Sequence, residues 1–398
     1  MLAAQVVDLV EAGTAKGREL VITDVRPPAD GFGPRYTIAG SESGYLRMNS
    51  NSYLGLSRHP AVLSAGEEAV SRFGAGPGAV RFISGTFSPH VELEARLARF
   101  HARESASIYS SAYATVVSTL TSLVTPETVV LSDELNHNCI INGLRMTRPK
   151  ARGVYAHLDY DELDHSLGQS HGKAKRAIVV TDGVFSMRGD FADLSVLAGI
   201  VARHDQEFEE NVVLVVDDSH GVGAYGAAGR GTEEISGGEA DILIGTLGKA
   251  FGVNGGYVAA SAATTHFLRE RGPMYVYSNP ISAGEAAAAG AALAIADSPE
   301  GVALLSHLAA MTARFESGLA DRGLETIPGP HPVVPLMVRD TARTARLVSH
   351  LFESGILATG LNFPVVPKGD EEIRFQINAS HTPADIDFVL GVLAKFAD

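Results

Sequence analysis

Val212-Val-Leu-Val-Val-Asp217-Asp218-Ser219-His220-Gly221 is an apolar run of five residues that ends in two acids. Five consecutive apolar residues are typical of a strand that is buried on both faces, as in a parallel sheet. Open α/β sheets bind their ligands at the carboxyl ends of such strands. The stretch therefore predicts an α/β fold in which Asp217 and His220 lie at the mouth of a binding site.

About thirty residues downstream, a separation typical of one strand-helix unit, comes Asp241-Ile-Leu-Ile-Gly-Thr246-Leu-Gly248-Lys249-Ala250. A lysine amine attacks carbonyl groups when it is partly desolvated and rigidly held. We expect the small neighbours Gly245 and Gly248 to let a flat cofactor approach Lys249. A phosphate-binding loop is excluded, because Leu243 stands where that pattern needs glycine and Ala250 where it needs Ser or Thr.

Each of these side chains also has a structural interpretation. Asp217 and Asp218 suit a metal pair or a helix cap, His220 a polar loop edge, and Lys249 the surface of a loop. Pyridoxal phosphate needs an anion beside its ring nitrogen, because the protonated ring accepts electrons from a substrate carbanion. Asp217 is a candidate for that anion, and His220 is a candidate donor to the phenolic oxygen of the ring.

Further motifs follow one another along nearly the whole chain. They are Asn51-Ser-Tyr53-Leu-Gly55, Gly76-Pro-Gly-Ala-Val-Arg81-Phe-Ile-Ser-Gly85-Thr86, His90-Val-Glu-Leu-Glu94, Tyr109-Ser-Ser111-Ala112-Tyr113, Asn136-His137, Thr181-Asp182-Gly-Val-Phe-Ser186-Met187, Pro364-Val-Val-Pro367 and Ile373-Arg374-Phe-Gln-Ile-Asn-Ala-Ser380-His381. Together with the two stretches above, they resemble the α-oxoamine synthase family of pyridoxal-phosphate enzymes. The resemblance is closest to its glycine C-acetyltransferase branch, also called 2-amino-3-ketobutyrate CoA ligase.

The resemblance implies PLP fold type I, the α/β fold of aspartate aminotransferase, with a mostly parallel central sheet flanked by helices and a smaller C-terminal α+β lobe. The pattern of the chain agrees, since strand-like runs at 177–180, 212–216 and 242–244 alternate with helical stretches, and 333–338 and 373–377 also read as strands. We expect an N-terminal helix and arm at 1–45, a PLP-binding large domain at 46–290 and a C-terminal small domain at 291–398. By composition, 27–34 reads as a linker and the alanine-rich segment 282–296 as a long helix.

The phosphate of the cofactor is expected at the start of a helix, because the free amides there form an anion site. A helix is predicted after Tyr109-Ser-Ser111, and the resemblance assigns phosphate binding to Ser111, Ala112 and Tyr113. It adds Thr246, and Ser278 from a partner subunit. A site that uses the partner subunit's Ser278 exists only in a homodimer.

The remaining assignments concern the ring and the substrates. The resemblance implies that His137 stacks on the cofactor ring, that Ser186 lies near the cofactor and the substrate carbonyl, and that Asn51 helps to bind the substrate. Arg374 is the expected anchor of the substrate carboxylate, because a guanidinium matches a carboxylate in two parallel hydrogen bonds. The structural alternatives are helix capping for His137, a helix-start serine for Ser186 and a surface ion pair for Arg374.

The implied reaction is acyl transfer to an amino acid. Lys249 holds the cofactor as a Schiff base, is displaced by glycine, and then removes a proton from the α-carbon, with Asp217, His220 and His137 as the other catalytic residues. The carbanion attacks an acyl thioester, acetyl-CoA in the closest branch, to give a 2-amino-3-oxo acid; relatives also lose carbon dioxide and give an α-amino ketone.

Three departures from the branch keep a second reading open. They are Ser52, Asn138-Cys139 where the branch carries Ala-Ser, and a shorter loop at 252–256. The alternative is a biosynthetic relative that uses a different amino acid, or a longer or carrier-protein-bound acyl group. An aminotransferase is disfavoured because the Asp-Asp-Ser-His-Gly and Asn-His pieces resemble the synthases. A non-catalytic relic is disfavoured because the expected lysine, aspartate and histidine are present.

Composition limits the partners and the compartment. The chain has 398 residues, 45% of them hydrophobic, and a formal charge of −14, which disfavours nucleic acid as a partner. A single cysteine allows no internal disulfide and suggests no metal cluster. No stretch approaches the roughly 20 apolar residues of a membrane span, so we expect a cytoplasmic protein. Anionic CoA would need a basic rim, for which Arg145, Lys150, Arg152, Arg269 and Arg271 are candidates unless they form a solvated face.

Overall fold

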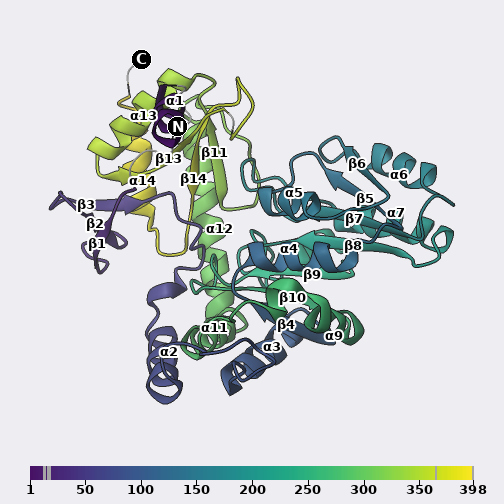
Figure 1. Ribbon diagram of the computed structural model, residues 1–398. Helices are drawn as coiled ribbons and strands as arrows, with labels where there is room; N and C mark the ends of the chain where they lie inside the picture. Colours follow the sequence, from purple (N-terminus) through teal and green to yellow (C-terminus); the bar gives the residue numbers. More distant parts are fainter. Residues whose placement is uncertain (12–14, 16–18, 364, 397–398) are drawn as a thin grey trace. The chain divides into compact units, whose positions relative to one another are not determined.

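The computed structural model describes residues 1–11, 15, 19–363 and 365–396 (Figure 1). Contacts divide the chain into two compact units. The larger consists of Asn51–Ser186 and Asp190–His307, and the smaller of Met1–Ser50, Met187–Gly189 and Leu308–Asp398. These divisions lie at 50/51 and 307/308, where we expected 45/46 and 290/291. Residues 1–50 share a unit with the C-terminal part because β12 (Ile356–Leu357) pairs in parallel with β3 (Gly44–Arg47).

The larger unit is built on a seven-stranded sheet in the order β4-β10-β9-β8-β7-β5-β6. Its strands are β4 (Ser105–Tyr109), β5 (Thr128–Asp133), β6 (Ala151–Tyr155), β7 (Arg176–Asp182), β8 (Val212–Asp217), β9 (Ile242–Thr246) and β10 (Gly256–Ala260). The strands from β9 to β6 are parallel, and β10 is antiparallel to both of its neighbours. The mostly parallel sheet predicted from the three strand-like runs is confirmed.

Helices cover both faces of this sheet (Figure 1). The helices of the larger unit are α2 (Pro60–Phe73), α3 (Ser88–Phe100), α4 (Ala112–Leu123), α5 (Asn138–Arg145), α6 (Tyr160–Gln169), α7 (Leu194–His204), α8 (Thr232–Ser236), α9 (Ala262–Arg271), α10 (Pro273–Val276) and α11 (Ala283–Ala296), with 3₁₀ turns at Leu56–Arg58 and Asp205–Glu207. α12 (Pro299–Ala320) begins in this unit and ends in the smaller one. The helix predicted at 282–296 is confirmed as α11, with Ser282 as its N-cap.

Alternate residues of the strands enter two separate cores, because successive side chains of a strand point to opposite faces. Val179, Leu214 and Val216 pack with Leu163 of α6 and Leu197 of α7. On the other face, Ile178, Val180 and Val215 pack with Leu120 of α4 and Ile140 of α5. Because helices cover both faces of the sheet, the central strands carry apolar side chains on both faces.

Polar residues gather where the parallel strands end. Asp133 ends β5, Asp182 ends β7, Asp217 ends β8 and Thr246 ends β9. Asp182 lies directly opposite Asp217 in the register of β7 and β8. Because parallel strands end at one edge of the sheet, these four side chains lie along the same edge, which is where such sheets bind ligands.

The smaller unit contains two sheets and its own helices. One sheet has the order β1-β2-β3-β12, with β1 (Ile22–Arg26) and β2 (Arg35–Ile38). The other has the order β11-β14-β13, with β11 (Val333–Met337), β13 (Thr359–Leu361) and β14 (Glu372–Gln376). The helices are α1 (Leu2–Glu11), α13 (Thr341–Glu353) and α14 (Pro383–Leu393). The predicted α+β lobe with strands near 333–338 and 373–377 is confirmed.

The linker predicted at residues 27–34 is wrong. The segment joins β1 to β2, which pair as an antiparallel hairpin. Gly33 donates its amide to the buried Asp385 carboxylate at 2.9 Å, and a Cβ atom at Gly33 would lie 2.3 Å from the Ser380 carbonyl oxygen. The glycine and proline content therefore serves a tight turn packed against the smaller unit.

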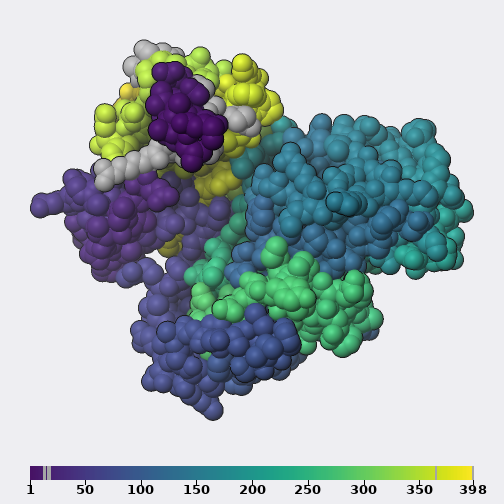
Figure 2. All heavy atoms as spheres, in the orientation of Figure 1, coloured from purple at the N-terminus to yellow at the C-terminus, as the bar shows by residue number. Residues whose placement is uncertain are grey.

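The α1 helix, in the darkest purple of Figure 2, lies on the surface, and all ten of its residues are exposed. Within the described ranges, no single helix is long and apolar enough to cross a membrane, and α11 with α12 meets that test only as a pair bent by 76°.

Candidate functional site

Lys249 lies in the loop between β9 and β10, and this loop is held by its own backbone. Leu247 donates to the Gly255 carbonyl at 2.9 Å, Val253 donates to the Leu247 carbonyl at 3.0 Å, and Gly252 donates to the Lys249 carbonyl at 3.0 Å. The Lys249 side chain is half-buried. A rigid loop and a partly desolvated amine are what a nucleophilic lysine requires.

Gly245 does not have the role that we expected from the sequence. A Cβ atom there would lie 2.3 Å from the ring of the buried Tyr257, which is the residue opposite it on β10. The residue is small so that Tyr257 can pack, and the expectation that it admits a flat cofactor is wrong. Gly248 is more open, because its Cβ atom would meet Thr246 Oγ1 only at 3.4 Å.

Asp217 is buried, and hydrogen bonds hold both of its carboxylate oxygens. Oδ1 accepts from the Ser219 hydroxyl at 2.6 Å and from the Ser219 amide at 3.2 Å, while Oδ2 accepts from the Cys139 thiol at 3.4 Å. An oriented buried carboxylate at the end of a central strand suits a pyridine nitrogen, which needs a fixed anion in the plane of its ring.

Asp218 has a structural role. Its carboxylate accepts from the amide and the hydroxyl of Thr232 at 2.7 and 2.6 Å, at the start of α8. Burial raises the pKa of Asp218 to about 7, although the Thr232 hydrogen bonds oppose this rise. The two neighbouring acids therefore bind different partners, and the helix-capping interpretation applies to Asp218.

His220 lies in a polar chain with the N-terminal part of the larger unit. Its Nδ1 atom lies 2.8 Å from the Tyr53 hydroxyl, whose oxygen also lies 3.4 Å from the Asn51 side-chain oxygen. Tyr53 is fully buried and His220 nearly so. The structure thus brings together Asn51 and His220, 169 residues apart in the chain, through a tyrosine whose role the motif alone did not define.

His137 is exposed and is the N-cap of α5, so its expected capping alternative is present. Its backbone amide donates to Asp182 Oδ2 at 2.7 Å, and Asn136 bonds the Val180 carbonyl and the Asp182 amide at 2.8 Å each. Capping uses only Nδ1, which accepts from the Cys139 amide at 3.2 Å. The exposed imidazole therefore remains suited to packing against a planar ring.

Asp182 is a site residue that our sequence analysis did not single out. Burial, and then the charge of Asp217, raise the pKa of Asp182 well above its usual range, while the His137 amide and Lys249 lower it. The signal was available, because Asp182 ends an apolar strand just as Asp217 does. Its relation to Asp217 comes from strand register, which the sequence does not display.

The start of α4 has the features of a phosphate site. Ser111 is the N-cap and its hydroxyl accepts from the Ala114 amide at 3.1 Å, while the first amides of any helix have no partner within the helix. A Cβ atom at Gly256 would lie 2.2 Å from the Ala112 nitrogen, so the glycine allows β10 to pack against the first turn of α4. Thr246, opposite Gly256, accepts from the Gly248 amide at 3.1 Å.

These groups fit pyridoxal phosphate. A helix N-terminus suits the phosphate, an oriented carboxylate suits the ring nitrogen, an exposed imidazole suits the ring face, and a half-buried lysine suits the aldehyde. Ser186, in the same unit, follows β7 and is half-buried. Ser278 is half-buried after α10, where its hydroxyl donates to the Asn279 carbonyl at 3.4 Å.

Arg374 lies on β14 of the smaller unit, between Thr359 of β13 and Pro335 of β11. Its guanidinium contacts the Met187 sulfur at 3.8 Å. Burial raises the pKa of the nearby Glu372 to about 8, although Arg374 and Arg188 oppose the rise. Burial thus favours the uncharged form of the carboxyl group beside Arg374.

His157 braces the turn that carries Ser186. Its Nδ1 and Nε2 atoms each lie 3.1 Å from a carboxylate oxygen, of Asp133 and Asp190 respectively, and its ring packs edge-on to Phe185 at 4.4 Å. Phe185 in turn donates its amide to the Asp190 carbonyl at 2.9 Å. One imidazole thus holds both sides of the turn that contains Ser186.

We expect His157→Gln to destabilise the protein in a pH-dependent way. Burial lowers the pKa of His157, but the hydrogen bonds and charges of Asp133 and Asp190 outweigh it and raise the pKa to about 9. The stabilisation is therefore fully present below pH 6.5, amounts to about 2 kcal/mol at pH 7, and is lost as pH rises through 9. Unfolding of wild type and variant at pH 7 and pH 10 checks this. The exposed His165→Gln is the control, and an equal loss at both pH values would contradict the assignment.

Comparisons with known proteins agree with this geometry. The model of the family Aminotransferase class I and II matches residues 43–393. Human mitochondrial 2-amino-3-ketobutyrate coenzyme A ligase is 38% identical over 379 residues, covering 94% of this chain and 86% of the relative. The 8-amino-7-oxononanoate synthase of Bacillus pumilus is 37% identical over 364 residues, covering 91% and 90%. A solved structure of SPT with a PLP internal aldimine has a TM-score of 0.89 at 25% identity, covering 99% of this chain and 96% of that one.

Proposed function

The chain belongs to the class I and II aminotransferase family, and from that membership we propose that it condenses glycine with acetyl-coenzyme A to give 2-amino-3-oxobutanoate. It is a PLP-dependent acyltransferase of the α-oxoamine synthase group, as the resemblance implied. The observation that carries the choice of substrates is the likeness to 2-amino-3-ketobutyrate CoA ligase over nearly the whole chain.

Pyridoxal phosphate, when bound, supplies an electron-accepting ring that stabilises a carbanion at the substrate α-carbon. In our proposal the first amides of α4 and the Thr246 hydroxyl bind its phosphate, and Asp217 keeps its ring nitrogen protonated. In this proposal the Tyr53 hydroxyl donates to His220 Nδ1, which leaves the imidazole proton on Nε2 to donate to the phenolic oxygen. These contacts hold the ring at the carboxyl edge of the sheet, beside Lys249.

Lys249 has two tasks in the proposed reaction. Its amine would hold the aldehyde of the bound cofactor, and it would also serve as the base that takes the proton from the α-carbon of the amino acid. The half-buried position of Lys249 in a hydrogen-bonded loop supports both tasks.

Arg374→Ala is expected to raise the KM for the amino acid by about 100-fold, the order expected from loss of a charge-assisted double hydrogen bond. The affinity for PLP should stay within about twofold, since the residue is assigned only to the substrate carboxylate. Steady-state kinetics and a PLP titration check the two values. Arg343→Ala, on α13 of the same unit, is the control. An unchanged KM would remove Arg374 from this role.

The acyl donor in our proposal is a coenzyme A thioester. Four cations, Arg145, Arg148, Lys150 and Arg152, occur within eight residues at the end of α5 and the start of β6, and all four are exposed. They form a local basic segment on a chain whose formal charge is −14, and such a segment attracts phosphate groups. Of the two further candidates from the sequence, Arg269 is less suitable, because it bonds Glu94 and Ser107.

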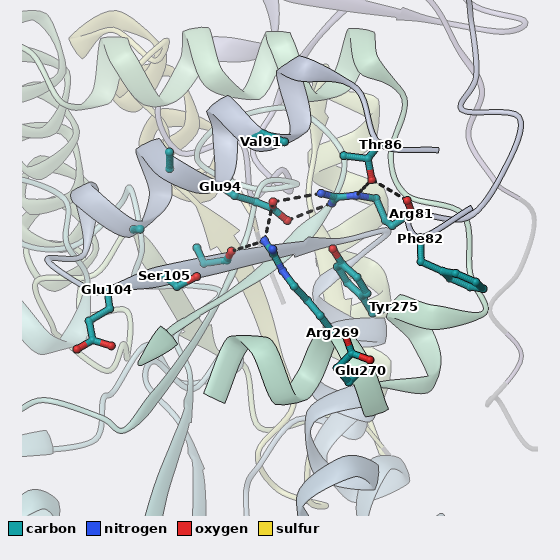
Figure 3. A pocket seen from close by; sticks show the side chains of 13 residues that line it. Arg81, Phe82, Thr86, Val91, Glu94, Glu104, Ser105, Arg269, Glu270 and Tyr275 are labelled. Carbon is teal, nitrogen blue, oxygen red and sulfur yellow. Dashed lines mark hydrogen bonds and ion pairs between the residues drawn. The ribbon is translucent and has the colours of Figure 1, made fainter. Parts of the chain in front are cut away.

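The proposal includes a homodimer in which the partner subunit's Ser278 contributes to the phosphate site. Its support is the exposure of three apolar side chains: Tyr277, next to Ser278, is 82% exposed, and Phe82 and Ile83 are 66% and 63% exposed. Figure 3 shows Phe82 at the rim of a cavity of about 500 Å³ in which Arg81 and Arg269 both point to Glu94. Apolar side chains exposed this far are typical of a surface that another chain covers.

A substrate panel tests the proposed function. Purified protein with PLP is mixed with glycine, alanine or serine, and with acetyl-, hexanoyl- or pimeloyl-CoA, while thiol and carbon dioxide are measured. We expect the highest kcat/KM with glycine and acetyl-CoA, with thiol release and no enzyme-dependent carbon dioxide. Thiol release only with alanine and a long acyl group would overturn the choice of substrates.

The second candidate is a synthase that takes a longer acyl group and releases carbon dioxide. It is favoured by the nearly equal likeness to 8-amino-7-oxononanoate synthase. The same panel separates the two, because the second candidate releases one carbon dioxide for each thiol. The cytoplasm is the proposed location for either activity.

A further inference from the structure

Cys139 lies in the first turn of α5, two residues after His137, and only 2% of its surface is exposed. Its sulfur lies 3.4 Å from Asp217 Oδ2 and 2.9 Å from His137 Nδ1. These are the two side chains assigned to the nitrogen and the face of the cofactor ring. One thiol therefore contacts both supports of that ring.

The neighbouring bonds determine where the thiol proton goes. The Cys139 backbone amide donates to His137 Nδ1 at 3.2 Å, so Nδ1 is an acceptor. The thiol has a single proton and donates it to Asp217 Oδ2, so its approach to Nδ1 is a close contact and not a second hydrogen bond. Burial, followed by the charges of Asp217 and Asp182, raises the pKa of Cys139 above its usual range, so that the thiol keeps this proton.

The bond from Cys139 completes the hold on Asp217. Both hydrogen bonds from Ser219 go to Oδ1. A carboxylate that is bonded through one oxygen can still rotate about that oxygen. The thiol binds Oδ2 from α5, which precedes Asp217 in the sequence, whereas Ser219 follows it. With both oxygens held, the plane of the carboxylate is fixed before a ligand arrives.

We propose that Cys139 is a positioning residue for the cofactor, whose thiol donates to Asp217 and packs against His137. It does not touch the reacting atoms in this proposal and acts through these two side chains. The inference depends on PLP binding and not on the choice of glycine or acetyl-CoA, so the substrate panel and the test below fail independently.

The test compares Cys139→Ala, Cys139→Ser and wild type in their affinity for PLP and in the visible absorbance of the bound cofactor between pH 6 and pH 9. Loss of one buried hydrogen bond to a carboxylate should weaken PLP binding by about tenfold in the alanine variant and shift the pH dependence of the absorbance. Serine keeps a donor and should restore the affinity to within about threefold of wild type. Thr147→Val, which removes a buried hydroxyl at the other end of α5, is the control and should match wild type.

Two results would overturn the proposal. Alanine and wild type with equal affinity and equal spectra would show that the thiol bond has no effect on the cofactor. Alanine and serine variants equally impaired would show that the sulfur matters only as packing volume. If the alanine variant does not fold, Cys139→Val takes its place, because valine fills the site but has no donor. The expected differences from wild type and from Cys139→Ser stay the same.

Discussion

Lys249→Ala is expected to abolish the absorbance band of the Schiff base between the protein and PLP and to lower kcat by about 10⁴-fold or more, because one change removes both the covalent attachment and the base. The half-buried amine has a rigid loop behind it, and alanine offers no group that could replace it. The cofactor should still bind through its phosphate, so it remains detectable in the dialysed protein. A spectrum and single-turnover thiol release measure the two effects.

Lys175→Ala is the matched control, since this lysine is half-exposed and pairs only with a surface acid, Glu209. The control should keep both the absorbance and the rate. A Lys249→Ala protein that retains the absorbance band would contradict the assignment and direct the search to another lysine.

Asp217→Asn is expected to lower kcat by about 100-fold to 1,000-fold, because the amide has nearly the size of the carboxylate but carries no charge to keep the ring nitrogen protonated. The affinity for PLP should fall as well, since the cationic ring loses its anionic partner. The asparagine can still accept from Ser219, so the local fold should survive. Kinetics with saturating PLP separate the chemical effect from the loss of affinity.

The chain offers an unusually close control for this variant, because Asp218→Asn makes the same change at the next residue. Asp218 is fully buried and binds Thr232, so its replacement should lower the thermal stability and leave the spectrum of bound PLP unchanged. Equal losses of activity in the two variants would contradict the separate roles given to these acids.

Much of the site was predictable because its residues follow apolar runs. Asp217 and Lys249 end or follow buried strands, and a parallel sheet brings such positions to one edge. The predicted helix after Ser111 is present, with Ser111 as its cap. In these cases the local pattern and the long-range packing lead to the same structure.

The features that were missed depend on contacts between distant segments. Asp182 became part of the site only through its register opposite Asp217, and Gly245 proved to make room for Tyr257. The glycine and proline residues at 27–34 suggested a linker, but Asp385, some 350 residues away, binds their turn. The composition of a segment indicates its local conformational preferences, but it does not show which distant residues the segment contacts.

Peptide mass spectrometry of PLP-loaded protein after borohydride reduction identifies the lysine that binds the cofactor. We expect a single pyridoxyl-modified peptide that contains Lys249. The modification should be absent from Lys249→Ala and present in the Lys175→Ala control. A modification on another lysine, or none at all in protein that has bound PLP, would overturn the assignment of Lys249.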